Sequence, residues 1–131
     1  MKMWRYFLPI AFVPLVMVLY AAYQLYQIEK VSSCVVEQYA SSLSPDGKHI
    51  AMTYGRDCGA TTGYNTQLSI APAEVSFDPD LFPAVLILKG KLTLNLRWIN
   101  EARLVVSVPK NAEQYRKEFA ASGVTLEYEL K

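Results

Sequence analysis

The sequence predicts a mainly β protein: an N-terminal transmembrane helix followed by a small antiparallel β-sheet or sandwich domain. Two observations lead to this fold class. An uncharged and almost wholly apolar run covers residues 6–28, and beyond it apolar and polar residues alternate in short segments separated by turn residues. We expect six or seven short strands and one short helix near residues 112–120.

The apolar run is predicted to be a single-pass signal anchor in a bacterial inner membrane. Its twenty-three uncharged residues would form a helix of about 35 Å, against a bilayer core of about 30 Å. Lys2 and Arg5 precede it, and positive flanks stay in the cytoplasm. The expected parts are therefore a cytoplasmic stub at 1–5, the anchor at 6–28, a linker at 29–33 and an exported, periplasmic β domain at 34–131.

Two other interpretations of the N-terminus remain open. A cleaved signal peptide needs small residues at its cleavage site, and Leu-Tyr-Ala at 19–21 fits that need poorly. A lipoprotein needs a lipid-attachment box next to the apolar core. Val-Ser-Ser-Cys at 31–34 resembles such a box, but Glu29 and Lys30 separate it from the core.

The first predicted β element is a hairpin. Ser-Pro-Asp-Gly-Lys at 44–48 has the chemistry of a turn, because Pro fixes φ, Asp bonds the backbone ahead of it and Gly accepts a positive φ. Residues 34–43 and 49–54 on its two sides are expected to be strands. The next strand is expected at 65–71, with Leu68 and Ile70 facing inward.

The rest of the chain predicts one loop, further short strands and the single helix. Three prolines mark an irregular loop, alternation marks the strands, and Trp98 is most simply a core residue on one of them. Ser-Gly after residue 121 would end the helix. In chain order these elements are a loop at 72–83, strands at 84–88, 93–98 and 104–108, a helix at 112–120 and a strand at 124–130.

Charge indicates which partners the exported part can have. Residues 30–131 hold eleven basic and eleven acidic side chains and no Lys/Arg cluster. Binding to nucleic acid needs a basic face that replaces the counterions of phosphate, so no nucleic-acid partner is expected. A protein partner is expected instead, and no particular small-molecule ligand is indicated.

The two cysteines are predicted to form a disulfide. Cys34 opens the first strand and Cys58 follows the second, so the hairpin would bring both to the same end, and exported thiols are oxidised. The alternative is a nucleophilic Cys58 with His49 as its base. His49 lies at the opposite end of the hairpin, about 30 Å away along an extended strand, which makes that geometry poor.

No metal site, cofactor site or catalytic motif is predicted. One His and two Cys do not make a standard zinc site. Asp78 and Asp80 could bind calcium, but they lack the ligand spacing and the glycine of a calcium loop, so a solvated turn is the simpler interpretation. The sequence also has no Gly-rich phosphate loop and no Gly-x-Ser-x-Gly.

The loop at 56–66 is the predicted partner-binding site. Gly59 and Gly63 allow sharp turns, and hydroxyl and amide groups lie between and after them. These groups either satisfy the backbone of the turn or form a binding surface. The residues expected to contact a partner are Thr61, Thr62, Tyr64 and Asn65.

Several stretches resemble a group of small bacterial envelope proteins defined only as a domain of unknown function. The resemblance rests on the Ser-Pro-Asp-Gly-Lys turn at 44–48, on 56–64 with its Cys-Gly-Ala-Thr-Thr core, and on 66–70. Leu-Arg-Trp at 96–98 and Leu-Val-Val at 104–106 resemble the closing strands of the same group. The resemblance implies an exported β domain with an N-terminal anchor or lipid signal, and it implies no activity.

Three functions are compatible with these features. The first is a membrane-anchored periplasmic protein-binding module, with an immunity protein against a periplasm-acting toxin as a special case. The second is an accessory or structural subunit of an inner-membrane or envelope complex, in which the helix itself makes contacts. The third is an enzyme, which would need a convergent acid–base set that the sequence does not provide. The sequence favours the first.

Overall fold

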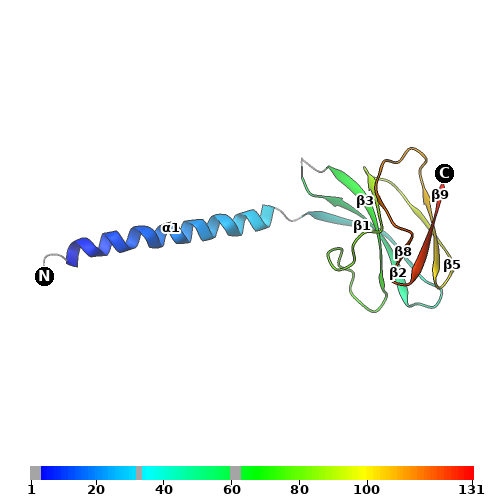
Figure 1. The fold of residues 1–131 in the computed structure, drawn as a ribbon, viewed down its shortest axis with the longest axis horizontal. Helices are drawn as coiled ribbons and strands as arrows, with labels where there is room; N and C mark the ends of the chain where they lie inside the picture. Colours follow the sequence, from blue (N-terminus) through cyan, green and yellow to red (C-terminus); the bar gives the residue numbers. More distant parts are fainter. Residues whose placement is uncertain (1–3, 32–33, 60–62) are drawn as a thin grey trace. The chain divides into compact units, whose positions relative to one another are not determined.

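The computed structural model describes residues 4–31, 34–59 and 63–131, and within its helix the side chains of residues 12–27. The chain divides into two compact units, Met1–Ser33 and Cys34–Lys131. Helix α1 (Trp4–Val31) belongs to the first unit, and the nine strands among the described residues belong to the second (Figure 1).

The predicted transmembrane helix is wrong for the part of the chain that the structure describes. Within those residues, no helix is both long enough and apolar enough to cross a membrane. The side chains of α1 are described over residues 12–27. Gln24 and Gln27 reduce the apolar character of this stretch, and each donates a hydrogen bond to the tyrosine hydroxyl four residues before it.

The first sheet is fully antiparallel and contains the predicted hairpin. Its strands lie in the order β1-β2-β3-β4-β7, so β1 is one edge of the sheet and β7 is the other. Their bounds are β1 (Val35–Leu43), β2 (His49–Asp57), β3 (Tyr64–Pro72), β4 (Leu86–Lys89) and β7 (Gln114–Lys117).

The second sheet corrects the expectation of a purely antiparallel domain. Its strands lie in the order β5-β6-β9-β8, and β6 pairs with β9 in parallel, because the chain returns to this sheet only after crossing to β7 in the first one. The bounds are β5 (Asn95–Asn100), β6 (Arg103–Val108), β8 (Ala120–Ala121) and β9 (Val124–Leu130).

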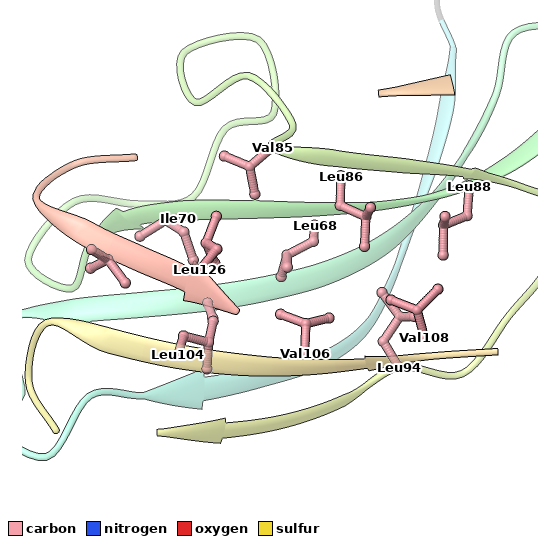
Figure 2. Close-up of a cluster of buried hydrophobic side chains, with 12 residues drawn as sticks. Leu68, Ile70, Val85, Leu86, Leu88, Leu94, Leu104, Val106, Val108 and Leu126 are labelled. Carbon is pink, nitrogen blue, oxygen red and sulfur yellow. The ribbon is translucent and has the colours of Figure 1, made fainter. Parts of the chain in front are cut away.

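The hydrophobic core lies between the two sheets. Figure 2 shows leucine and valine side chains of both sheets pointing toward one another. Leu68 and Ile70 face inward, as predicted, and Trp98 packs half-buried against the same cluster. The buried members are Ala51, Leu68, Ile70, Val85, Leu86, Leu88, Leu94, Leu104, Val106, Val108, Val124 and Leu126.

The turn between β1 and β2 forms through the local chemistry that predicted it. The Ser44 hydroxyl donates to the Asp46 carboxylate at 2.6 Å, and the Lys48 amide donates to the same carboxylate at 3.1 Å. Gly47 takes a φ of 72°, which residues with a side chain rarely adopt. The Ser44 bond lowers the pKa of Asp46, so the charged form that accepts these bonds is favoured.

The predicted helix at 112–120 is wrong, because the segment forms β7 and β8 instead. Both strands are short, and together they raise the strand number from the expected six or seven to nine. The aromatic side chains of the segment, Tyr115 and Phe119, are exposed, so burial of an apolar face does not stabilise a helix here. Pairing with β4 decides its conformation: the Lys89 amide donates to Glu113 O at 3.0 Å and the Glu118 amide to Val85 O at 2.8 Å.

The irregular segment at 72–83 packs on the face of the first sheet that points away from the core. The rings of Tyr54 and Phe77 lie 5.3 Å apart, and the Ser69 hydroxyl donates to Phe82 O at 2.8 Å. Arg56 makes an ion pair with Asp80 at 3.1 Å. These contacts explain why β2 is buried on both faces, although its sequence alternates.

Candidate functional site

The predicted disulfide is confirmed. Cys34 and Cys58 are bonded, with their Cα atoms 4.2 Å apart, and they flank the paired residues Val35 and Asp57 at one end of the first hairpin. The alternative in which Cys58 is a nucleophile is wrong in this state, because its sulfur is bonded to that of Cys34 and is not a free thiol. His49 begins β2 at the opposite end of the strand, next to the turn.

The structure describes two of the four predicted binding residues, Tyr64 and Asn65, and these two lie on opposite faces of β3. Thr61 and Thr62 lie outside the residues that the structure describes. Tyr64 and Asn65 are the first two residues of β3, and successive residues of a strand point to opposite faces. Asn65 Oδ1 accepts a hydrogen bond from the side-chain amide of Gln67 at 2.7 Å, whereas Tyr64 lies on the face that carries Thr66 and Leu68.

Tyr64 takes part in a cluster of four side chains, which we call the tyrosine cluster: Glu37, Tyr39, Tyr64 and Lys91. The Tyr64 hydroxyl donates to the Glu37 carboxylate at 3.0 Å and also bonds the Tyr39 hydroxyl. Lys91 donates to the same carboxylate at 3.3 Å, and its ammonium lies 5.3 Å from the Tyr39 ring centroid and 6.0 Å from the Tyr64 ring centroid. The cluster therefore joins β1, β3 and the segment before β5.

Gly55 leaves the space on β2 that the two tyrosine side chains occupy. It lies on β2 opposite Glu37 and Thr66, and a Cβ atom at this position would overlap the hydroxyls of both Tyr39 and Tyr64. Glycine inside a strand often marks such a close approach. The two rings can meet above the sheet because β2 presents no side chain there.

The electrostatics of the cluster favour a charged Glu37 and a neutral Tyr64. The hydrogen bond from Tyr64, followed by the bond and the charge of Lys91, lowers the pKa of Glu37. The hydrogen bond with Tyr39, then desolvation and the bond to Glu37, raises the pKa of Tyr64 well above its ordinary value. Glu37 and Lys91 cancel each other, so the cluster has no net charge.

A pocket of about 420 Å³ opens beside the cluster. Four consecutive residues of β1 form one wall, the segment at 91–94 forms the other, and Thr53 of β2 lies between them. Buried Leu94 and half-buried Leu92 provide apolar surface, while threonine, glutamine and the charged pair provide polar surface. The lining residues are Glu37, Gln38, Tyr39, Ala40, Thr53, Lys91, Leu92, Thr93 and Leu94.

A β-bulge gives the pocket its β1 wall. The register between β1 and β2 shifts between Gln38 and Ala40, so Tyr39 is an extra residue in the strand. A bulge lets two consecutive residues face the same side of a sheet. Tyr39 thus reaches the tyrosine cluster while Ala40, opposite Thr53, lines the pocket next to it.

The opposite wall is fixed by Thr66, a buried residue of β3. Its hydroxyl donates to Gly90 O at 2.8 Å and accepts from the Leu92 amide at 2.9 Å. Gly90 has a φ of 81°, which permits the turn after β4. The segment at 91–94 is therefore held beside β1 by hydrogen bonds from the core side of the first sheet.

Sequence reasoning selected Tyr64 but missed its three partners and the pocket. Glu37 and Lys91 are far apart in the chain, and neither belongs to a motif. The one local signal is Gly55, an isolated glycine in a segment that otherwise has the pattern of a strand. It indicates a close approach, but it does not say which side chains approach.

Asp78 and Asp80, which the sequence analysis weighed as calcium ligands, form hydrogen bonds and an ion pair within the protein. The Asp78 carboxylate accepts from the Asp80 amide at 2.9 Å, and Asp80 pairs with Arg56. Over residues 4–31, 34–59 and 63–131, no group of three or more His, Cys, Asp or Glu side chains is placed to hold a metal ion. Asp78 therefore stabilises the turn at 78–80, and Asp80 connects this turn to β2.

In comparisons with known proteins, the chain matched no protein-family model, no curated protein and no solved structure. The resemblance to the bacterial envelope group stays a prediction based on the sequence stretches given above.

Proposed function

We propose that residues 34–131 form a protein-binding module and that its binding surface is the pocket with the tyrosine cluster. One observation supports this most: the pocket combines an apolar floor with a neutral polar rim in which aromatic side chains are already held in place. Interfaces are enriched in tyrosine and depleted of charged residues at their centre, and here the two charges of the rim pair with each other. A surface ordered before binding loses less conformational entropy when a partner arrives.

A photo-crosslinking experiment tests this function. The full-length chain is produced in its source cells with p-benzoylphenylalanine at Thr93 on the pocket rim, or at Thr125 of β9 as a control, because both residues are exposed. We expect irradiation to link Thr93, but not Thr125, to one protein that mass spectrometry identifies. No adduct at Thr93, or the same adducts at both positions, would refute a binding surface here.

We also propose that the module works in an oxidising compartment outside the cytoplasm. The disulfide supports this, because cytosolic reductants keep most thiols reduced. Cells are quenched with acid and treated with a maleimide-coupled polymer, with and without prior reduction. We expect modification of two cysteines only after reduction, and two thiols that react without reduction would contradict the proposal.

A second candidate is an accessory subunit of a larger assembly, with α1 as the contact element. Large apolar side chains that stay exposed along the described part of the helix favour it, and Met17 is an example at 67% exposure. Deleting residues 1–33 separates the two candidates. If the shortened chain no longer associates with the larger assembly but still gives the Thr93 adduct, α1 is the contact element. If it keeps both the association and the adduct, the accessory-subunit candidate is excluded.

A further inference from the structure

β1 is an edge strand of the first sheet, with the bulge at Tyr39 in its middle. It is the outermost strand of the first sheet and pairs only with β2, so among the described residues no strand lies on its other side. Its side chains are mostly exposed, including Val35 at 69% and Leu43 at 57%. An edge strand has a row of backbone N–H and C=O groups that a further extended chain can pair with.

The two ends of this edge differ. Near Leu43, the indole of Trp98 donates to Ser42 O at 3.4 Å, so a side chain from β5 covers that carbonyl. Within 35–41, Ala40 O accepts from the hydroxyl of Thr53 on the neighbouring strand β2 at 3.2 Å, and no side chain of the second sheet is seen to bond the described backbone there. An added strand therefore has room along 35–41.

The pocket lies along the same open part of the edge. Its β1 wall is Glu37 to Ala40, so a chain paired with 35–41 would pass beside the pocket. Alternate side chains of a strand point to one face, so one of them would enter the space between β1 and 91–94. The available volume, about 420 Å³, accommodates a large side chain.

Charge and polarity define that side chain. The rim charges are already paired, since Glu37 accepts from both Tyr64 and Lys91. A charged side chain would enter beside Ala40, Leu92 and Leu94 without a free counterion, at a high desolvation cost. An apolar side chain has no charge to desolvate, and it would cover the apolar atoms of Ala40, Leu92 and Leu94.

We infer that β1 accepts an extended segment of a partner protein, which adds a strand to the first sheet and places an uncharged, apolar side chain in the pocket. This inference rests on the proposed protein-binding function. It specifies how the partner binds, because backbone pairing supplies affinity and the pocket supplies selectivity.

Three synthetic peptides and the full-length chain test the inference. The probe is acetyl-Thr-Val-Thr-Leu-Thr-Val-Thr-amide with a fluorescent label. In the second peptide, two successive residues are N-methylated, which blocks hydrogen bonding along both edges of the strand. In the third, Glu replaces the central Leu. Fluorescence anisotropy gives Kd, and hydrogen exchange with mass spectrometry locates the contact.

The probe is expected to bind with a Kd below about 1 mM and to slow exchange of amides in residues 35–41. The N-methylated and Glu peptides should bind at least about tenfold more weakly, a difference of about 1.4 kcal/mol. These comparisons use the unmodified protein, so they do not depend on whether a variant folds.

A matched pair of variants adds the pocket to the test. Thr93→Trp fills the pocket mouth from an exposed position, and Thr125→Trp adds the same side chain on β9. We expect the first to weaken probe binding at least about tenfold and the second to leave it within about twofold.

Four results would overturn the inference: no binding of any peptide at 1 mM, equal binding of the N-methylated peptide, protection outside 35–41, or no effect of Thr93→Trp. A fifth is protection of 35–41 in the free chain that is lost on dilution, which would assign the edge to a second copy of this chain. If Thr93 still crosslinks a partner, each of these results overturns the edge-strand inference and leaves the protein-binding function standing. If the peptides bind as expected but the Thr93 adduct is missing, the protein-binding function alone is refuted.

Discussion

At the scale of single residues, the tyrosine cluster requires a glycine at position 55, because a Cβ atom there would overlap two of its hydroxyls. Gly55→Ala places a Cβ against the hydroxyls of Tyr39 and Tyr64, with the Tyr64 Cζ atom only 2.6 Å away. Because the neighbouring atoms belong to rings held by hydrogen bonds, we expect a loss of about 2 kcal/mol in the free energy of unfolding, as for other overpacked sites. Urea denaturation measures this loss.

A double-mutant cycle provides the control for that prediction. Tyr64→Ala removes the ring that Gly55→Ala collides with, so the double variant should be more stable than the sum of the single effects predicts. Strictly additive effects would show that the Cβ is accommodated in some other way.

Glu37 gives the cluster a predicted pH dependence. Its pKa in the folded protein is lowered, first by the Tyr64 hydrogen bond and then by Lys91, so the charged form is favoured by folding. Its contribution is present above the ordinary carboxyl pKa and is lost as the pH falls through the lowered one. We expect the stability difference between the native chain and Glu37→Gln to be largest at pH 7 and to shrink as the pH falls below the ordinary carboxyl pKa of 4.5.

Urea unfolding of both proteins across this range provides the measurement. Asp46 also has a lowered pKa, but it is common to both proteins and cancels in the difference. A difference that stays constant down to pH 3 would show that the Glu37 charge does not stabilise the fold.

At the scale of the secondary-structure elements, the disulfide closes the first hairpin. It joins residues separated by 24 positions, and for a loop of that length the chain-entropy estimate is about 3 kcal/mol. We expect Cys58→Ser to lower the free energy of unfolding by about that amount. Guanidinium denaturation measures it, and the Cys34→Ser/Cys58→Ser double variant should lose no more than either single variant. A much larger loss in the double variant would indicate separate roles for the two cysteines.

The elements predicted correctly are those whose signals are local. The turn at 44–48 has its own hydrogen bonds, so its residues suffice to predict the hairpin, and the hairpin in turn predicts the disulfide. The segment at 112–120 has no such signal, since all four residues of β7 are exposed and its conformation depends on β4. The anchor was predicted from the length and apolar character of 6–28 and from the positive charges before it, without regard to any tertiary contact.

The candidate site was predicted less well than the fold, for a related reason. Tyr64 is marked by its place after a glycine-containing loop, but its environment comes from Glu37 and Lys91, which only the folded sheets bring together. The pocket likewise depends on the bulge at Tyr39 and on the bonds that Thr66 makes to 91–94. None of these pairings has a signature in local periodicity.

At the scale of the whole molecule, the β unit is expected to fold without the helix. All buried members of the core cluster lie between Ala51 and Leu126, and the disulfide also lies within Cys34–Lys131. A fragment of residues 34–131 should therefore keep a cooperative thermal transition, with its Tm within about 2 °C of that of the β unit in the full-length chain, because 1 kcal/mol shifts Tm by about 4–8 °C in a domain of this size.

Circular dichroism melting of the two proteins, recorded at a β-sheet wavelength under oxidising conditions, measures the difference. The Cys58→Ser form of the fragment is the control, and its Tm should fall as far as it does in the full-length chain, since the bridge closes the same loop in both. A fragment that melts more than about 8 °C lower would require more than about 1 kcal/mol from residues 1–33. The helix would then be part of the folding unit, and peptide binding to β1 would have to be measured only on the chain that contains it.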